Sequence, residues 1–186
     1  MWIPKPNGKQ RPLGIPTITD RVVQTAAMLV LEPIFEADLL PEQYAYRAGR
    51  GAQAAVTAVH RLLSTGHQQV VDADLSGYFD SIPHAELMKS VARRIVDRQV
   101  LHLIKQWLEA PVEEDEGHGH RKRTTHNRDT GRGTPQGAPI SPLLSNLYMR
   151  RFLLGWQQKG YHHRWSAHIV NYADDVVICC RGKAEE

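Results

Sequence analysis

Two adjacent carboxylates, Asp174 and Asp175, interrupt an apolar stretch near the end of the sequence, IVNYADDVVICC. Like charges repel one another, and the β-branched residues on both sides predict two largely buried strands. The pair therefore needs either a divalent cation to neutralise it or a solvated turn between the strands. Because Asp is a common turn residue, the dipeptide alone favours the turn, and the rest of the chain has to decide.

A second group of carboxylates accompanies the predicted strand QQVVDADL. Asp72 and Asp74 share one face of this strand because side chains alternate, and Asp80 follows in the next loop. Together with the adjacent pair, these groups supply enough hard oxygen ligands for two divalent cations. Such a pair of ions supports phosphoryl transfer, in which one ion activates the attacking hydroxyl and the other stabilises the leaving pyrophosphate. In the alternative interpretation, Asp72 and Asp80 only cap helices.

The elements around these carboxylates mix helices with strands. The segment PKPNGKQRPLGIP predicts a hairpin with Asn7-Gly8 at its tip, and we expect Asp20 to cap the helix that follows. A further helix is predicted over 51–65 and ends at Gly66. Helices after Pro83 and over 100–110 complete this part of the chain. Because several strands are joined as hairpins, the pattern favours an α+β fold.

A polar stretch, EEDEGHGHRKRTTHNRDTGRG, separates the last of these helices from the segment GTPQG. Its composition predicts a mobile loop or a long hairpin. His118, His120 and His126 could be considered zinc ligands, but no cysteine lies nearby. A solvated or RNA-contacting loop is therefore favoured.

The composition limits the class of protein. The chain has 186 residues, 41% hydrophobic and 23% charged, with a net charge of +3, which fits one domain or two small lobes. It has no apolar run long enough for a membrane span and does not open on a signal peptide, so we expect a cytoplasmic protein without a membrane partner. Cys179 and Cys180 are neighbours on a predicted strand, which favours packing roles over a disulfide.

Three segments carry a resemblance to a known family. VDADLSGYFDSIPH, GTPQGAPISPLLSNLYM and NYADD resemble motifs A, B and C of reverse transcriptases, in that order. The resemblance is closest to the group II intron-encoded and group II-like bacterial enzymes. Upstream, IPKPNGKQRPLGIPTITDRVVQTA is similar to the family's fingers motif, and EQYAYRAGRGAQAAV to a segment that usually reads F-R-P-G-R. Nearly the whole chain is covered.

The resemblance implies the fingers and palm of a right-hand polymerase, with an antiparallel palm sheet packed on helices. Residues 1–68 would be mainly fingers and residues 69–186 mainly palm. The family continues into a thumb, so we expect the chain to be truncated before it, with the thumb absent. We therefore expect little processive activity from the 186-residue chain alone, and a homodimer could cover its exposed apolar surface.

The implied activity is RNA-directed DNA polymerisation, in which dNTPs are added to a primer 3′ end on an RNA template. The family's catalytic triad matches Asp74, Asp174 and Asp175, which would bind two Mg²⁺ ions with the backbone carbonyl of Leu75. Mn²⁺ could substitute for Mg²⁺. Asp72 is not expected to be essential.

The resemblance also implies contacts with the incoming nucleotide. Phe79 matches the family's aromatic steric gate, which leaves no room for a 2′-hydroxyl; its alternative role is an ordinary core aromatic. Lys5 and Arg11 match the residues that contact the triphosphate, a role that suits ammonium and guanidinium donors. The remaining matches are Gln136 and Gly137 in the motif B turn and Tyr172 beside the primer end.

The sequence departs from the family's usual pattern at two positions, and two alternative functions remain to be considered. Ala48 replaces the usual proline in YRAGR, and Ala138 stands where many relatives have a second glycine. A viral-type RNA polymerase is the nearest enzymatic alternative, and both the YADD sequence and Phe79 argue against it. The alternative from another class is an RNA-binding, maturase-like or vestigial module that binds intron RNA without polymerising.

Overall fold

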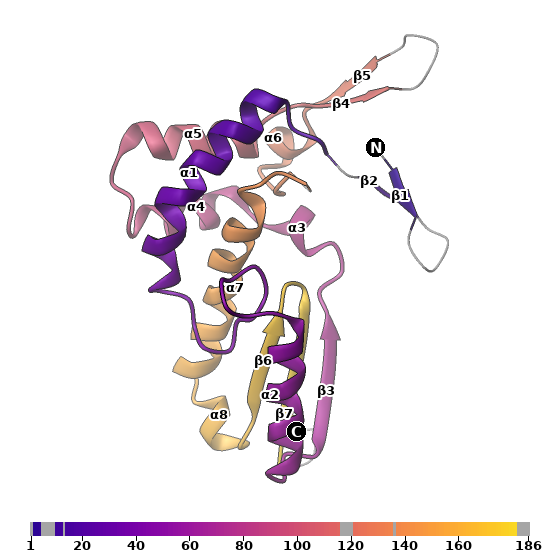
Figure 1. Ribbon diagram of the computed structural model, residues 1–186, viewed down its shortest axis with the longest axis vertical. Helices are drawn as coiled ribbons and strands as arrows, with labels where there is room; N and C mark the ends of the chain where they lie inside the picture. The colour runs from indigo at the N-terminus through magenta and orange to yellow at the C-terminus, as the bar shows by residue number, and fades with distance from the viewer. Residues whose placement is uncertain (1, 5–9, 13, 116–120, 136, 182–186) are drawn as a thin grey trace. The chain divides into compact units, whose positions relative to one another are not determined.

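The computed structural model describes residues 2–4, 10–12, 14–115, 121–135 and 137–181 (Figure 1). The chain forms two compact units. Unit 1 comprises residues 1–34 and 79–144, and unit 2 comprises residues 35–78 and 145–186. Helices and antiparallel sheets occur together, which confirms the predicted α+β class. The division into fingers (1–68) and palm (69–186) concerns functional subdomains and stays a prediction.

Unit 2 contains a three-stranded antiparallel sheet in the order β3-β7-β6. Its strands are β3 (Gln69–Asp74), β7 (Asp175–Cys180) and β6 (His168–Tyr172). Strands β6 and β7 are largely buried, as their β-branched composition predicted. Strand β3 lies at an edge of the sheet, and its Val70 and Val71 are 44% and 37% exposed.

Helix α2 (Ala52–Ser64) packs against β6 and β7 (Figure 1). Its end was predicted from Gly66, and that residue has φ +94°, a backbone conformation that glycine adopts without strain. The short helix α8 (Tyr161–Arg164) precedes β6 in the chain. Cys179 and Cys180 are both free and buried, in agreement with packing roles.

A loop before α2 is held by two buried polar side chains. Gln43 is fully buried, and its Nε2 donates to the carbonyl of Asn146, 2.9 Å away on helix α7 (Ser141–Gln158). Arg47 donates to both carboxylate oxygens of Glu36 and to the carbonyls of Leu40 and Gln43. These bonds satisfy backbone groups that a buried loop would otherwise leave unpaired.

Unit 1 has a helical core. Helices α4 (His84–Ala92) and α5 (Arg98–Leu108) pack against each other. Asp97 caps α5 by accepting hydrogen bonds from the backbone N–H groups of Gln99 and Val100. Fully buried side chains from this unit include Ile82, Leu87, Val91, Ile104, Leu108 and Ile140.

Helix α1 (Ile18–Glu36) begins earlier than the sequence predicted. Thr17 precedes the helix, and its Oγ1 accepts a hydrogen bond from the backbone N–H of Asp20 at 3.1 Å. The Thr17 hydroxyl in turn donates to the Asp20 carboxylate at 2.6 Å. The prediction that Asp20 is the cap was therefore wrong, because the helix begins before Asp20 and the Thr17 hydroxyl caps it.

Strands β1 (Trp2–Pro4) and β2 (Gln10–Pro12) pair antiparallel, as predicted for the first hairpin. Its expected tip, Asn7-Gly8, lies outside the described residues. Among the described residues, no helix is long and apolar enough to cross a membrane.

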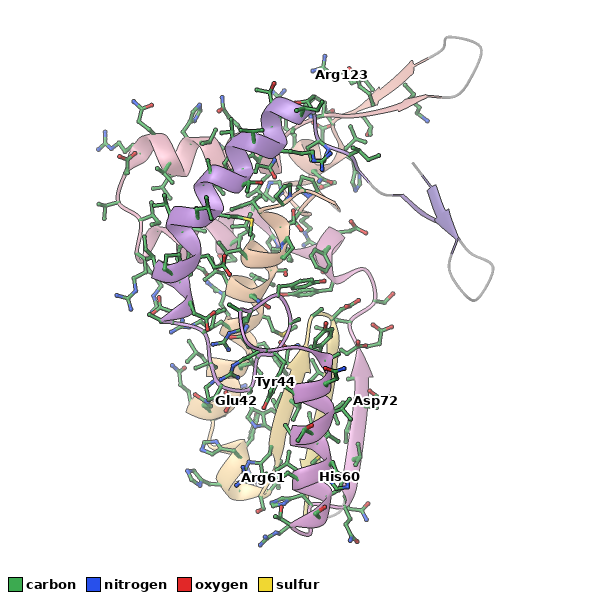
Figure 2. The ribbon with its side chains drawn as sticks, in the orientation of Figure 1. Glu42, Tyr44, His60, Arg61, Asp72 and Arg123 are labelled. Carbon is green, nitrogen blue, oxygen red and sulfur yellow. The ribbon has the colours of Figure 1, made fainter. Side chains whose placement is uncertain are left out.

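The polar stretch before motif B forms a second hairpin rather than an irregular loop. Strand β4 (Val112–Asp115) pairs antiparallel with β5 (Arg121–Thr124), and α6 (His126–Thr130) follows. The register places acidic residues opposite basic ones, including Glu113 opposite Arg123, which is labelled in Figure 2. Opposite charges across a strand pair stabilise the hairpin. His118 and His120 lie outside the described residues.

Candidate active site

The register of unit 2 brings together the carboxylates that lie 100 residues apart in the chain. Asp74, the last residue of β3, lies directly opposite Asp175, the first residue of β7. Asp174 belongs to the two-residue turn between β6 and β7, because Tyr172 pairs with Asp175. The backbone N–H of Leu75 donates to the Asp174 carbonyl at 3.1 Å. The three aspartates therefore share one end of the sheet.

The turn itself has an unusual backbone. Ala173 has φ +56°, and no positive φ occurs at Asp174. A positive φ at the first central residue is typical of a type II′ turn, where glycine is preferred. Because alanine adopts this region at a cost in free energy, the surrounding structure must hold the turn in place.

Asn171 on β6 provides that restraint. Its Nδ2 donates to the carbonyls of Ala173 at 2.9 Å and Asp175 at 3.1 Å. The residue is fully buried, and its backbone bonds with Glu42 and Tyr44 anchor it from the other side. Sequence analysis missed Asn171, although a polar residue at a buried strand position beside two aspartates was a usable signal.

Negative charge accumulates at this end of the sheet. Partial burial raises the pKa of Asp175, and the nearby carboxylates of Asp174, Asp74 and Asp72 raise it further. A cation bound here would relieve that repulsion, and carboxylate oxygens are the ligands that Mg²⁺ prefers. Within the described residues, however, no three His, Cys, Asp or Glu side chains already form a metal-binding group. The donor chemistry therefore fits Mg²⁺, whereas the side chains would have to turn toward a shared point.

Tyr78 is a second residue that sequence analysis missed. It is buried, and its hydroxyl donates to the Ser145 carbonyl on α7 at 2.7 Å. Burial, followed by the neighbouring Tyr148, raises the pKa of the Tyr78 hydroxyl well above its ordinary value, and Asp174 adds to the shift. Tyr78 therefore stays a neutral hydrogen-bond donor and ties the segment after β3 to α7.

Phe79 lies in unit 1 at the start of that unit's second segment, within α3 (Tyr78–Ser81). Its ring is half-buried, and its carbonyl accepts a hydrogen bond from the backbone N–H of Thr134 at 2.8 Å. The backbone N–H of Gly133 donates to the carbonyl of Ile82 at 2.9 Å, and His84 Nε2 lies 2.8 Å from the Gly133 carbonyl. Motif A and the segment leading into motif B are thus hydrogen-bonded to each other.

The structure describes only some of the other residues that are predicted to contact the nucleotide. Gly137 has φ +96°, which agrees with its expected place in a turn that needs glycine. Tyr172 ends β6 and pairs with Asp175. Arg11 lies on β2 opposite Ile3, whereas Lys5 and Gln136 lie outside the described residues.

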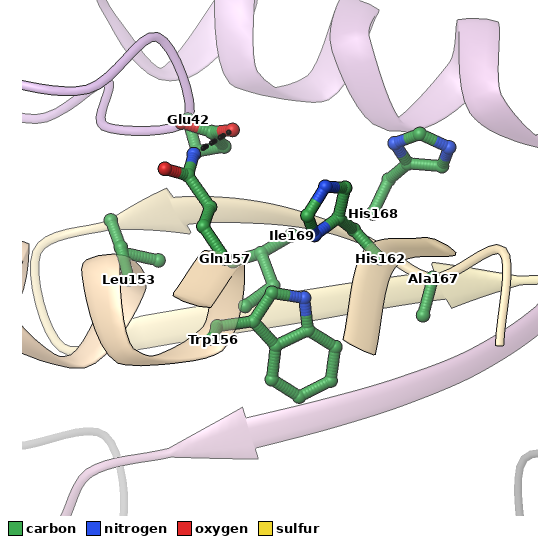
Figure 3. Close-up of a pocket in the computed structure, with 8 residues that line it drawn as sticks. All are labelled: Glu42, Leu153, Trp156, Gln157, His162, Ala167, His168 and Ile169. Carbon is green, nitrogen blue, oxygen red and sulfur yellow. Dashed lines mark hydrogen bonds between the residues drawn. The ribbon is translucent and has the colours of Figure 1, made fainter. Parts of the chain in front are cut away.

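A small polar cavity lies at the other end of β6 (Figure 3). It has a volume of about 80 Å³ and is lined by Glu42, Leu153, Trp156, Gln157, His162, Ala167, His168 and Ile169. Gln157 Nε2 donates to Glu42 Oε1 at 3.1 Å. Three buried polar atoms in its wall, Glu42 Oε2, Trp156 Nε1 and His162 Nδ1, have no hydrogen-bond partner among the described residues. Because β6 separates this cavity from the YADD turn, it is distinct from the carboxylate site.

The antiparallel sheet with three aspartates at one end is the arrangement that the sequence predicted for a polymerase palm. The chain belongs to the reverse transcriptase (RNA-dependent DNA polymerase) family, whose model matches residues 3–186. The predicted resemblance is thereby confirmed.

Comparison with individual proteins supports a group II-like member of this family. The chain is 40% identical over 156 residues to protein YkfC of Escherichia coli K12, covering 82% of this chain and 39% of that protein. It is 34% identical over 163 residues to the group II intron-encoded protein LtrA of Lactococcus lactis, covering 86% of this chain and 26% of LtrA. The chain thus spans well under half the length of these relatives.

A solved structure agrees with this assignment. The fold matches a chain of the Cas6-RT-Cas1–Cas2 complex with a TM-score of 0.53 and 25% identity, covering 93% of this chain and 28% of that one. The α+β polymerase fold predicted from the sequence is confirmed.

Proposed function

We propose that this chain is the core of an RNA-directed DNA polymerase that adds dNTPs to a primer 3′ end on an RNA template. The observation that carries the proposal is the pairing of Asp74 with Asp175 beside the Asp174 turn. Membership of the reverse transcriptase family supports the same activity.

Asp74, Asp174 and Asp175 are the proposed ligands of two Mg²⁺ ions, and Mn²⁺ could replace them. The bound ions would supply activation of the primer hydroxyl and stabilisation of the leaving pyrophosphate. The chain's own contribution is to hold three carboxylates at one end of a sheet, on a turn restrained by Asn171. The Leu75 carbonyl, the fourth proposed ligand, accepts the Tyr78 N–H and keeps a second lone pair for a cation.

The remaining proposed contacts select and orient the nucleotide. Phe79 would exclude a 2′-hydroxyl, and the Thr134 bond to its carbonyl supports a fixed position for its backbone. Lys5 and Arg11 would bind the triphosphate as charged donors. Gln136, Gly137 and Tyr172 would border the template base and the primer end.

A second function, maturase-like RNA binding without polymerisation, is supported by the likeness to the group II intron-encoded protein LtrA. Intron RNA would then be the partner. The two functions can reside in one protein, so a test of the carboxylates is needed to separate them. A cytoplasmic location stays a prediction from the sequence.

The test is primer extension by the full-length protein with Mg²⁺ and a defined RNA template. We compare the wild type with Asp74→Asn and Asp174→Asn, which keep the side-chain shape and remove the charge. Loss of a metal ligand should reduce extension about a thousandfold, because the ions supply several kcal/mol of transition-state stabilisation. Asp72→Asn is the matched control and should remain active.

Extension at the wild-type rate by either catalytic variant would exclude the proposed metal site. RNA binding without extension by the wild-type protein would support the maturase-like alternative instead. Circular dichroism of each variant separates loss of chemistry from loss of folding.

A further inference from the structure

Helix α1 presents an apolar stripe to solvent. Ile18, Val22 and Leu29 are 78%, 63% and 74% exposed. Together with the exposed Ala26 and Pro33, they recur at spacings of four, four, three and four residues, which places them on one face of the helix. A continuous stripe of this kind differs from the isolated exposed apolar residues of most protein surfaces.

The opposite face of α1 is already used for packing within unit 1. Gln24 and Leu31 are 3% exposed, and Gln24 Oε1 accepts a hydrogen bond from the backbone N–H of Ile140 at 3.4 Å. Helix α1 therefore buries one face within unit 1 and carries the apolar stripe on the opposite, exposed face. An exposed apolar stripe on a helix whose other face is already packed marks a candidate surface for a partner.

The order of residues in the stripe is symmetric about the middle of the helix. Val22 and Leu29 are equally far from the midpoint between Thr25 and Ala26, and so are Ile18 and Pro33. If two copies of α1 cross antiparallel about a two-fold axis at Ala26, half a residue from this midpoint, Val22 of one subunit meets the partner's Leu29. The small side chain of Ala26 at the centre allows the two helices to approach closely.

The charges beside the stripe are symmetric about a midpoint one residue further along the helix, between Ala26 and Ala27, so an axis at Ala26 fits both sets to within half a residue. Arg21 and Glu32 are 11 residues apart, close to three helical turns, so they lie on the same flank. The antiparallel arrangement places Arg21 near the partner's Glu32, and the symmetry repeats the contact. Neither side chain forms an ion pair among the described residues. The other flank carries the exposed Val23 and Val30, which are centred on the same point as Arg21 and Glu32 and which an axis at Ala26 therefore brings near each other.

We propose that the outer face of α1 is a homodimer interface in which two copies of the helix pair antiparallel. The symmetric stripe and the two self-complementary flanks favour a second copy over an unrelated partner, because neither feature is needed to bind a different surface. The inference is independent of the polymerase function, since no catalytic residue takes part.

The first test measures the mass of the 186-residue chain in solution by sedimentation or light scattering. We expect a concentration-dependent species of twice the 21.0 kDa chain mass. Val22→Asp and Leu29→Asp should each give a monomer, because an unpaired charge would be buried at the interface. Val56→Asp is the matched control: Val56 is 67% exposed on α2 and should have no effect on the mass. A wild-type chain that stays monomeric at all concentrations would mean that another partner covers α1, and would overturn the proposal.

The second test determines the direction of pairing by cysteine cross-linking. Ala26→Cys should form an intermolecular disulfide, because residue 26 lies near the two-fold axis. Val22→Cys alone should not cross-link, whereas Val22→Cys combined with Leu29→Cys should. The natural Cys179 and Cys180 are buried and do not interfere. Efficient cross-linking of Val22→Cys alone would indicate parallel helices and overturn the antiparallel arrangement.

The third test uses charge reversal on the flank. Arg21→Glu should weaken dimerisation by roughly tenfold or more, because it places two like charges together. Glu32→Arg should have a similar effect, and the double variant should restore the dimer. If the double variant is as weak as the single ones, the proposed pairing between Arg21 and the partner's Glu32 is wrong.

Discussion

Asp74 lies directly opposite Asp175 in the antiparallel register of β3 and β7. Like charges directly opposite each other destabilise a sheet. The position is therefore poor for stability alone, and this cost is expected where a cation binds. The arrangement leads to predictions that link metal binding, stability and activity.

The first prediction concerns metal binding and thermal stability. Mg²⁺ should raise the Tm of the wild-type chain, because ligand binding stabilises the native state, by about 1.4 kcal/mol at ten times the Kd. For a chain of this length the rise should be about 3–5 °C. The Tm of the Asp74→Asn variant should not rise when Mg²⁺ is added. Differential scanning fluorimetry with Mg²⁺ and with EDTA measures both Tm values.

Asp175→Asn provides a second arm of that experiment. The pKa of Asp175 is higher in the folded state than in the unfolded state. The folded protein is therefore favoured while Asp175 is protonated, and this stabilisation is lost as the pH rises through the folded pKa. Ionised Asp175 thus destabilises the metal-free protein at pH 7. In EDTA, Asp175→Asn should therefore have a Tm at least equal to that of the wild type. A lower Tm would contradict the proposed repulsion.

The second prediction concerns the choice of sugar. Phe79→Val or Phe79→Ala should admit rNTPs and reduce the preference for dNTPs at least tenfold, since the ring is proposed to occupy the space of a 2′-hydroxyl. Single-nucleotide incorporation with each triphosphate measures the ratio. Phe152→Ala removes an aromatic ring that is 49% exposed on α7 and is the control. Unchanged discrimination in the Phe79 variants would make Phe79 an ordinary packing residue.

The third prediction concerns Asn171 as a positioning residue for the YADD turn. Asn171→Ala removes two hydrogen bonds to the turn carbonyls and should destabilise the protein by about 2 kcal/mol. Extension by the folded protein should also fall, because Ala173 would no longer be held at positive φ.

Asn146→Ala is the matched control for that experiment. Asn146 is 2% exposed and donates to the Ala45 carbonyl at 2.8 Å, in a contact that does not involve the turn. It should lower stability to a similar degree while leaving the rate per folded molecule closer to that of the wild type. Equal losses of rate in the two variants would reduce Asn171 to a general packing role.

The fourth prediction concerns pH and the cavity of Figure 3. Burial lowers the pKa of His168, the neighbouring His67, His162 and Arg181 lower it further, and Glu42 opposes them. His67 contacts His168 edge-on, with ring centroids 4.8 Å apart. The unfolded chain therefore binds a proton more readily than the native state does, and stability is lost as pH falls below about 6.5 toward the folded pKa.

His168→Gln removes that titration and should reduce the loss of Tm between pH 7.5 and pH 5.5. His60→Gln, on the exposed side of α2, is the control and should follow the wild type. Thermal denaturation over this pH range measures the difference. A His168 variant with the same pH dependence as the wild type would exclude His168 as a source of acid destabilisation.

Local sequence signals predicted most of the elements correctly. The β-branched runs around YADD formed the buried strands β6 and β7, and the alternation in QQVVDADL formed β3. Gly66 and Gly137 adopt positive φ where turns were expected. These features depend on neighbouring residues, so a single sequence contains the information needed to predict them.

Sequence patterns predicted less well which of several neighbouring groups forms a particular hydrogen bond or strand pair. Asp20 was expected to cap α1, but the Thr17 hydroxyl is better placed to accept its N–H. The composition of the charged stretch after α5 is compatible with a loop or a hairpin, and its acidic and basic halves pair as the hairpin β4–β5. Both outcomes depend on side-chain geometry that composition does not specify.

The sequence by itself determined the number and type of the carboxylates, their order along the chain and the family to which the chain belongs. Only the tertiary structure decided which residues meet. Asp74 reaches Asp175 through a strand register, and Asn171 reaches the turn carbonyls because β6 buries it there. A shift of one residue in that register would turn these side chains to the other face, so the site depends on long-range pairing that no local pattern specifies.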